Sequence, residues 1–582
     1  MKTVRIILSL LFSVSACQTP PVNDLEDSGA DAERKDTIVA YGVGAERYDS
    51  EQLGTFSHTL HHISHNAIRS SSLQESYAMT LFLASLQGLL NAEQSDMLYI
   101  QNNNEYDWIP EMSRSVCDVR YWEDDLVGMI EHLLPGVASK GYILVDDFQK
   151  DDTGWMTDAN HQVTAVAASY AAGYQALVLT PVLLENSLFD GLEMRFDARG
   201  KTMEDVLEFF VSNPSLFAHD GIISSPRVPH RNVDLAIAHR WVAVHSFDDK
   251  LTDGFFSRIE PLSPRFSYNG PYDSEGKNVQ FSSGYDLFAL AAGWCGNLST
   301  HERMIKTQKA VEHNQTRPEV DFDRQDVHYV LILCSDGGNL EYFDKKFRDC
   351  FIHPSYGTFP VSFMMTPAIL EYKPAVHEWY YENMASDCSF VTSLSGLGDI
   401  YPVHMSGDDV REEYGRMTSA AMEKEGSRYL AIMDRAGEQN YSWEQLMEAS
   451  EPIVRNIPQC EGVIFIGYAK IWSGETAVLN GVPVVPIRYS CFYSNGKPMD
   501  DPDNKKSQKA VSDALKLMPK DPTSTEGYSI ILFNANPPDI DPKPQIMSDM
   551  QVLVDYIRQD EGIEIVDARQ FFQLYNHHIL HK

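Results

Sequence analysis

The chain has 582 residues, of which 43% are hydrophobic and 11% are aromatic. This is several times the length of one hydrophobic core, so we expect a globular protein with two to four domains. The formal net charge is −36, and the sequence has no basic stripe. We therefore expect no nucleic-acid partner, because nucleic-acid binding depends on Lys and Arg side chains that neutralise phosphates.

The first seventeen residues have the layout of a secretory signal. Two basic residues and the apolar run 6–14 precede the small pair Ser15-Ala16, and Cys17 follows directly. A cysteine at this point resembles the bacterial lipobox, in which the sulfur is acylated; an ordinary signal peptide that contains a cysteine is the alternative. We expect an extracytoplasmic protein, periplasmic or on the cell surface, that is tethered to a bacterial membrane through Cys17.

Residues 18–37 are polar, acidic and contain proline, which predicts a disordered tether. Alternating helix and strand patterns follow, such as the β-α-β pattern between 141 and 179. They predict small α/β domains at 38–138, 139–250 and 251–322. The seven cysteines after Cys17 are far apart and form no CxxC pair, so we expect neither a zinc site nor a disulfide framework, and mostly buried free thiols.

The region 323–582 has a regular alternation of strands and helices. Apolar, β-branched runs occur at 328–334, 359–364, 388–392, 428–433, 462–467, 483–488, 528–533 and 563–566. Helical patterns separate most of these runs. Eight such units predict a C-terminal (β/α)8, TIM-barrel-like domain, although an open doubly wound sheet would give the same alternation. The weakest link lies between the fifth and sixth runs, where only 474–480 is available for a helix.

In parallel α/β folds, catalytic and binding residues lie in the loops at the carboxyl ends of the strands. The residues after each run are therefore the candidate site residues. Asp336 follows the first run, Asp399 the third and Asp434 the fourth. Two carboxyl groups across one cavity can act as general acid and as base or nucleophile on a glycosidic bond. We therefore predict Asp336, Asp399 and Asp434 as catalytic residues, with Glu475 as an outside candidate. The predicted substrate-binding residues are Asn339, Tyr401, Tyr468, Trp472, Arg488 and Tyr489.

The stretch 395–402, SGLGDIYP, resembles the signature that names the GxGYxYP family of putative glycoside hydrolases. Other stretches resemble landmarks of this family in the same order, among them AAGWCGNLST and HYVLILCSDGGN. The likeness covers roughly residues 40 to 580. It implies small N-terminal domains before a TIM-barrel-like domain, a secreted or lipoprotein form, and a carbohydrate substrate.

Two positions depart from the family pattern. Asp399 stands where the family signature has a tyrosine, and Gly338 stands where the usual SDGDN has its second acid. One carboxylate is lost and another is gained nearby, which leaves two expectations: a glycoside hydrolase with an altered acid-base pair, or a glycan-binding lipoprotein that does not cleave. A metal-dependent deacetylase that uses Asp336 and a histidine such as His404 is a third alternative; otherwise we expect no cofactor.

Four histidines, at positions 58, 61, 62 and 65, would share one face of a helix if their segment were helical. Imidazole nitrogens at this spacing can hold a transition metal. The neighbouring serines and asparagine are poor additional ligands, so we expect a polar or interfacial helix face without a metal.

Overall fold

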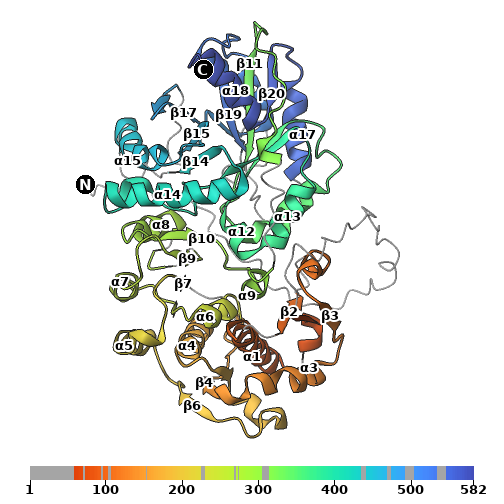
Figure 1. Ribbon diagram of the computed structural model, residues 1–582, viewed down its shortest axis with the longest axis vertical. Coiled ribbons are helices and arrows are strands. Elements are labelled where there is room, and N and C mark those ends of the chain that lie inside the picture. The colour runs from red at the N-terminus through yellow and green to blue at the C-terminus, as the bar shows by residue number, and fades with distance from the viewer. Residues whose placement is uncertain are drawn as a thin grey trace, which may run out of the picture.

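The computed structural model describes residues 58–69, 72–93, 96–101, 106–152, 154–224, 230–267, 270–272, 274–304, 313–433, 441–467, 474–491, 504–533 and 546–582. In Figure 1 the N-terminal elements fill the lower half of the molecule and the C-terminal elements the upper half. Within these residues, no helix is both long enough and apolar enough to cross a membrane. Cys17 and the predicted tether lie outside the described residues.

Three small parallel sheets form the N-terminal half. The first has the order β2-β1-β3, the second β5-β4-β6 and the third β10-β9-β7-β8. Their strands are β1 (Thr59–Ser64), β2 (Met97–Gln101), β3 (Asp118–Tyr121), β4 (Tyr142–Leu144), β5 (Leu177–Leu179), β6 (Met194–Asp197), β7 (Ile222–Ser224), β8 (Ala243–Val244), β9 (Pro264–Phe266) and β10 (Phe288–Leu290). Because β7 to β10 share one sheet, strands on both sides of residue 250 are hydrogen-bonded together.

Nine helices accompany these strands in the described part of the N-terminal half. They are α1 (Leu73–Ala92), α2 (Ile109–Met112), α3 (Leu126–Leu133), α4 (Asp158–Tyr174), α5 (Met203–Ser212), α6 (Val233–His239), α7 (Asp249–Phe256), α8 (Glu275–Ser283) and α9 (Leu298–His301). The longest, α1, begins at the cap Ser72, whose hydroxyl accepts from the amide of Glu75. Most of α1 is buried on all sides, which makes it a central helix.

The C-terminal half contains a ten-stranded, curled sheet with the order β16-β17-β15-β14-β13-β12-β11-β19-β18, and β20 pairs with β11. The strands are β11 (His328–Cys334), β12 (Val361–Met365), β13 (Cys388–Thr392), β14 (Tyr429–Met433), β15 (Gly462–Ile466), β16 (Ala477–Leu479), β17 (Val482–Pro486), β18 (Tyr489–Cys491), β19 (Tyr528–Phe533) and β20 (Ile563–Val566). The helices are α11 (Lys346–Phe351), α12 (Ala368–Tyr372), α13 (Pro374–Glu382), α14 (Asp408–Glu425), α15 (Trp443–Arg455), α16 (Gln508–Leu515), α17 (Ile546–Ile557) and α18 (Ala568–His578).

The ladders of this sheet are parallel except for one hairpin, β16 with β17. The expected helix between the fifth and sixth strands is therefore wrong, because residues Ala477–Leu479 form β16 instead. β17 pairs with β15, while β18, only two residues further on, pairs with β19. The chain is thus a mixed α/β protein with several parallel sheets, the largest a curled half-barrel. These pairings do not establish a regular (β/α)8 barrel.

Side chains on one face of the curled sheet form a core of their own. It contains alternate residues of the strands, such as Tyr329, Leu331 and Leu333 of β11. Helix α18 contributes Phe571, Phe572 and Tyr575 to this core, and the ring of Phe572 stacks on that of Tyr429 with centroids 5.5 Å apart.

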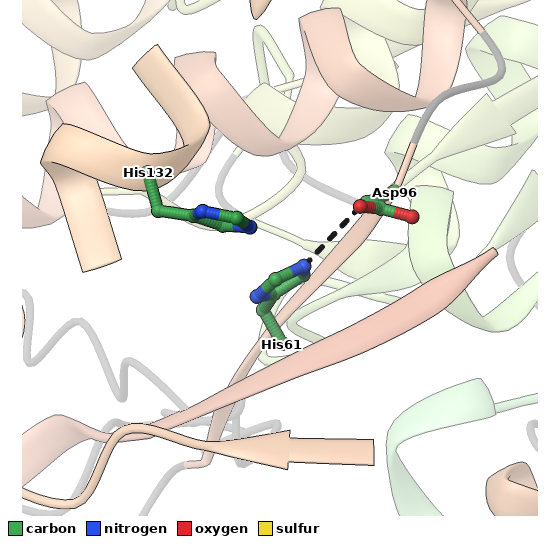
Figure 2. Close-up of side chains that lie close together, drawn as sticks. All are labelled: His61, Asp96 and His132. Atoms are coloured by element: carbon green, nitrogen blue, oxygen red, sulfur yellow. Dashed lines mark hydrogen bonds and ion pairs between the residues drawn. The ribbon is translucent and has the colours of Figure 1, made fainter. Parts of the chain in front are cut away.

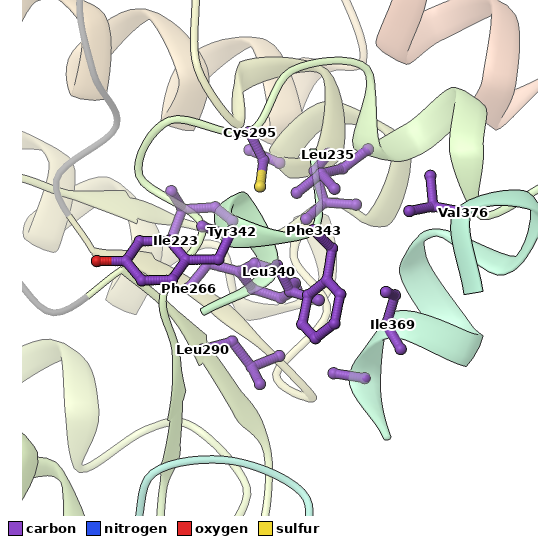
Figure 3. Close-up of a cluster of buried hydrophobic side chains, with 14 of the residues drawn as sticks. Ile223, Leu235, Phe266, Leu290, Cys295, Leu340, Tyr342, Phe343, Ile369 and Val376 are labelled. Atoms are coloured by element: carbon purple, nitrogen blue, oxygen red, sulfur yellow. The ribbon is translucent and has the colours of Figure 1, made fainter. Parts of the chain in front are cut away.

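The third N-terminal sheet and the C-terminal half share one hydrophobic core (Figure 3). Ile223, Phe266 and Leu290 come from the sheet, and Leu340 and Phe343 come from the segment after β11. All five are fully buried, so each half covers apolar surface of the other.

We predict slow amide exchange at the two residues between β17 and β18. The amide of Ile487 donates to the carbonyl of Phe465 at 3.0 Å, and the amide of Arg488 donates to that of Ile530 at 2.9 Å. Both hydrogens should therefore exchange as slowly as those of the β11–β19 ladder in native-state hydrogen exchange. Exchange of the Arg488 amide at the rate of an exposed loop would contradict the pairing of this segment with both neighbours.

Candidate functional site

The loop after β11 is pressed against the end of β12. A Cβ atom at Gly337 would lie 1.6 Å from the carbonyl oxygen of Met364, so no side chain fits at this position. The carbonyl of Gly337 accepts from the amide of Thr366 at 2.8 Å, which holds the two strand ends together. Asp336, directly before this glycine, has a left-handed backbone with φ of 67°.

The loop after β13 leaves the sheet through three consecutive residues with positive φ, Leu394, Ser395 and Gly396. At Gly396 φ is 127°, a conformation that favours glycine. Gly398 has a different role, because a Cβ there would lie 2.7 Å from the carbonyl oxygen of Ala289. The group that this glycine allows to approach closely is the backbone of β10.

The two loops meet at Gly338 and Asp399. A Cβ atom at Gly338 would lie 3.1 Å from Oδ1 of Asp399 and 2.1 Å from Cδ1 of Leu394. An acidic side chain at position 338 would thus need space beside the carboxylate of Asp399. The two departures from the family pattern are therefore neighbours in space, and the structure brings the Asp336 loop and Asp399 together.

Asp399 is enclosed by protein. Its backbone forms an antiparallel bridge with Ala289, in which each amide donates to the other's carbonyl at 2.8 Å. The hydroxyl of Tyr414 lies 3.2 Å from both the amide nitrogen and the carbonyl oxygen of Gly398. Asp399 is 1% exposed and Tyr401 is 2% exposed. Neither residue therefore faces open solvent, because β10 and the end of α8 cover this loop.

Asp336 keeps some contact with solvent, whereas its carboxyl group is surrounded by protein. This burial raises its pKa above the ordinary value of 3.8. The hydroxyl of Ser335, which donates to Oδ2 at 2.8 Å, and the positive charge of Lys346 both oppose the shift without cancelling it. A carboxyl group of this kind holds its proton to higher pH than an exposed one.

The other predicted residues are distributed differently. Asn339 is buried and bridges to Ala291, next to the Asp399–Ala289 bridge. Arg488 and Tyr489 are half-buried between β17 and β18, and Glu475 is exposed. Nothing in the structure brings these last three to the meeting point of the two loops. Asp434, Tyr468 and Trp472 lie outside the described residues.

His404 belongs to the short helix η9 (Pro402–His404), which follows the SGLGDIYP stretch. Its ring centroid lies 6.3 Å from that of Tyr401 and 5.7 Å from that of Tyr441. Burial lowers its pKa. Nothing in the described part of the chain combines His404 with Asp336 in a cluster of metal ligands, as a deacetylase would require.

The histidine-rich segment at the N-terminus is a strand. Residues Thr59–Ser64 form β1, which pairs with β2 on one side and β3 on the other, so the expected helix face does not exist. His61 instead lies near Asp96 and His132 (Figure 2). Among the described residues, this is the one group of three possible metal ligands whose donor atoms lie within 4.8 Å of one another.

The hydrogen bonds of His61 do not suit a metal ligand. Nδ1 accepts from the indole nitrogen of Trp122 at 3.0 Å, and Nε2 lies 3.5 Å from Oδ2 of Asp96. Because an indole can only donate, the neutral ring of His61 carries its proton on Nε2, the nitrogen that faces Asp96. A metal bound to Nε2 would require the ring proton on Nδ1. That N–H would then face the indole N–H of Trp122, which is also a donor. The geometry therefore describes a Trp-His-Asp hydrogen-bonded chain.

Sequence reasoning missed the residues that hold the second loop in place. Tyr414 lies in α14, and Ser283, whose hydroxyl accepts from the amide of Tyr401 at 3.0 Å, ends α8. Neither position belongs to a recognisable motif. The nearest signal was the glycine pattern of SGLGDIYP, which shows that something approaches closely without showing what.

We predict that Asp336→Asn stabilises the fold at neutral pH. The folded state raises this pKa, so it binds more protons than the unfolded state, and the free energy of unfolding falls as pH rises through the folded pKa. The Asp336→Asn side chain cannot ionise, so the variant does not lose stability in this way as pH rises. Its melting temperature should exceed that of the parent protein near pH 7, and the gain should disappear below about pH 4, where unfolded Asp is also protonated.

Asp560→Asn is the matched control, because its pKa is lowered by Lys520 at 2.6 Å. It should change stability with the opposite sign, destabilising the protein above the ordinary Asp pKa. An Asp336→Asn protein that is less stable than the parent at pH 7 would contradict the assignment.

Residues 326–576 match the model of the GxGYxYP putative glycoside hydrolase C-terminal domain. Across the whole fold, the chain is similar to a crystal structure of a putative hydrolase from Bacteroides thetaiotaomicron VPI-5482, with a TM-score of 0.74 and 20% identity over 90% of this chain and 96% of that one. Comparison with curated proteins gave no match. Residues 326–576, which include both loops of the candidate site, are therefore similar to the C-terminal domain of the GxGYxYP putative glycoside hydrolases.

Proposed function

We propose that the protein is a glycoside hydrolase whose working carboxylates are Asp336 and Asp399. One observation carries this proposal: the loops at the carboxyl ends of β11 and β13 meet, with Oδ1 of Asp399 3.1 Å from the Cβ position of Gly338, two residues after Asp336. Two acids on neighbouring loops at this end of a parallel sheet can supply the general acid and the base or nucleophile for hydrolysis of a glycosidic bond. The match of residues 326–576 to a family of putative glycoside hydrolases supports the same chemistry.

The environments of the two acids suggest different roles. Asp336 has a raised pKa and keeps some solvent contact, which suits the general acid that protonates the leaving oxygen. Asp399 would then act as base or nucleophile on the other face of the sugar. The separation of their carboxyl groups with substrate bound would select inversion or retention. Asp434 remains a proposed third acid after β14.

We also propose that the curled sheet closes into a TIM-barrel-like ring. The short span between β17 and β18 supports closure, because β17 pairs with β15 and β18 with β19, which joins both ends of the strand order. The single core that collects side chains from β11 to β20 on one face supports it as well. The exchange rates of the Ile487 and Arg488 amides test this point.

Activity of two variants tests the hydrolase. We expect Asp336→Asn and Asp399→Asn each to reduce kcat on a polysaccharide that the wild type cleaves by at least about 100-fold, in the range usual for loss of an acid-base group. Asp409→Asn, the same change at an exposed position at the start of α14, should keep full activity. If each of the two variants cleaves the polysaccharide at the wild-type rate, Asp336 and Asp399 are not the catalytic pair.

A second candidate function is glycan binding without cleavage, and the burial of Asp399 favours it. At 1% exposure this carboxylate reaches a sugar only if the covering segment moves or the substrate enters through the Asp336 side. Measuring affinity and turnover of Asp399→Asn together separates the two functions. Lost turnover with retained binding indicates the enzyme, whereas a wild type that binds glycans and never cleaves them indicates the binding protein.

We propose further that the protein acts outside the cytoplasm, anchored to a bacterial membrane by a lipid on Cys17. The layout of residues 1–17 supports this location, since the apolar run and the small pair before Cys17 fit a lipoprotein signal. Cells expressing the full chain and fed a labelled fatty acid should incorporate label into the wild type and none into Cys17→Ser. Equal labelling of both proteins would refute the anchor.

A further inference from the structure

A groove lined mainly by aromatic residues lies beside the candidate site. Its volume is about 840 Å³, within the range of ligand sites. One wall is formed by the end of α8 and the turn after it, and the other by His404. The groove is lined by Tyr272, Lys277, Gln280, Phe281, Gly284, Tyr285 and His404.

The groove adjoins the segment that follows the loop after β13. His404 lies two residues after Pro402, the last residue of the SGLGDIYP stretch. Its ring lies near Tyr401, which packs in the core of the curled sheet, and near Tyr441. A chain of sugars that leaves the candidate site on this side would therefore meet the groove.

Hydrogen bonds fix the two walls relative to each other. The amide of Ser406 donates to Oδ1 of Asp286 at 2.8 Å, and its hydroxyl donates to Oδ2 at 2.6 Å. The amide of Tyr401 donates to the hydroxyl of Ser283. Asp286 is 5% exposed and Ser283 is fully buried. The groove thus exists before any ligand arrives, which reduces the entropy cost of binding.

The lining combines flat apolar faces with hydrogen-bonding groups. The rings of Tyr272 and Tyr285 pack edge-on against Phe281, with centroids 5.7 Å and 5.2 Å away. The hydroxyl of Tyr285 donates to Asp253, which holds this ring in place. Lys277 and Gln280 add donors at the rim. Although the chain carries a net charge of −36, none of the described lining residues is acidic.

We propose that this groove is a subsite that binds a neutral or acidic pyranose unit of a glycan, at a distance from the bond to be cleaved. The inference rests on the proposed function for its substrate class. The C–H face of a sugar ring would pack on Tyr285, and Lys277, Gln280 and His404 would bind its hydroxyl or carboxylate oxygens.

Calorimetric titration of the full-length protein with five hexasaccharides tests the subsite: maltohexaose, cellohexaose, xylohexaose, chitohexaose and hexagalacturonate. We expect at least one to bind, and we expect Tyr285→Ala and His404→Ala to weaken that binding by about tenfold or more. Tyr285→Phe keeps the ring but loses the bond to Asp253, so it should retain more of the binding than Tyr285→Ala. Lys277→Ala should weaken hexagalacturonate most, and Lys250→Ala, an exposed lysine on α7, should change nothing.

Two outcomes overturn the subsite. In the first, none of the five probes binds at millimolar concentration. In the second, Tyr285→Ala and His404→Ala both bind with wild-type affinity, while their thermal unfolding shows that they are folded. The outcome is separable from the proposed function. If cleavage depends on Asp336 and Asp399 and the groove variants have no effect, only the subsite is rejected. If binding depends on the groove residues and no cleavage occurs, only the hydrolase is rejected.

Discussion

The candidate site depends on two short backbone bridges between distant parts of the chain. Ala289 pairs with Asp399, and Ala291 pairs with Asn339, so the segment at and after β10 contacts the loops of both β11 and β13. The bridge to Asp399 satisfies backbone groups that would otherwise be buried without partners, and it does not depend on the side chain of Asp399. The position of Asp399 is thus set by main-chain hydrogen bonds, which leaves its side chain open to change between relatives.

This constraint explains the glycines better than a ligand does. Gly398 leaves room for the carbonyl of Ala289, Gly337 for the carbonyl of Met364, and Gly338 for Leu394 and the carboxylate of Asp399. In each case the space that a side chain would take is filled by the protein itself. The two positions that depart from the family pattern, 338 and 399, therefore lie side by side in the fold.

The strands could be predicted from the sequence where burial on both faces produced continuous apolar runs. The observed limits of β11, β13, β19 and β20 coincide with the expected ones, because turn residues interrupt those runs sharply. The histidine segment was misjudged because its spacing fits a helix equally well, and only pairing with β2 and β3 decides the matter. The covering of Asp399 by β10 left no local pattern at all, since a contact between segments far apart in the chain does not change the periodicity of either one.

The shared core of Figure 3 has a consequence for how such proteins diverge. The family match begins at residue 326, yet Leu340 and Phe343 inside it are buried against Ile223, Phe266 and Leu290 outside it. The C-terminal region is consequently not a module that can be recombined freely with other partners. This packing favours inheritance of the two halves together. A substitution on one side of the shared core would then be matched by a substitution on the other side.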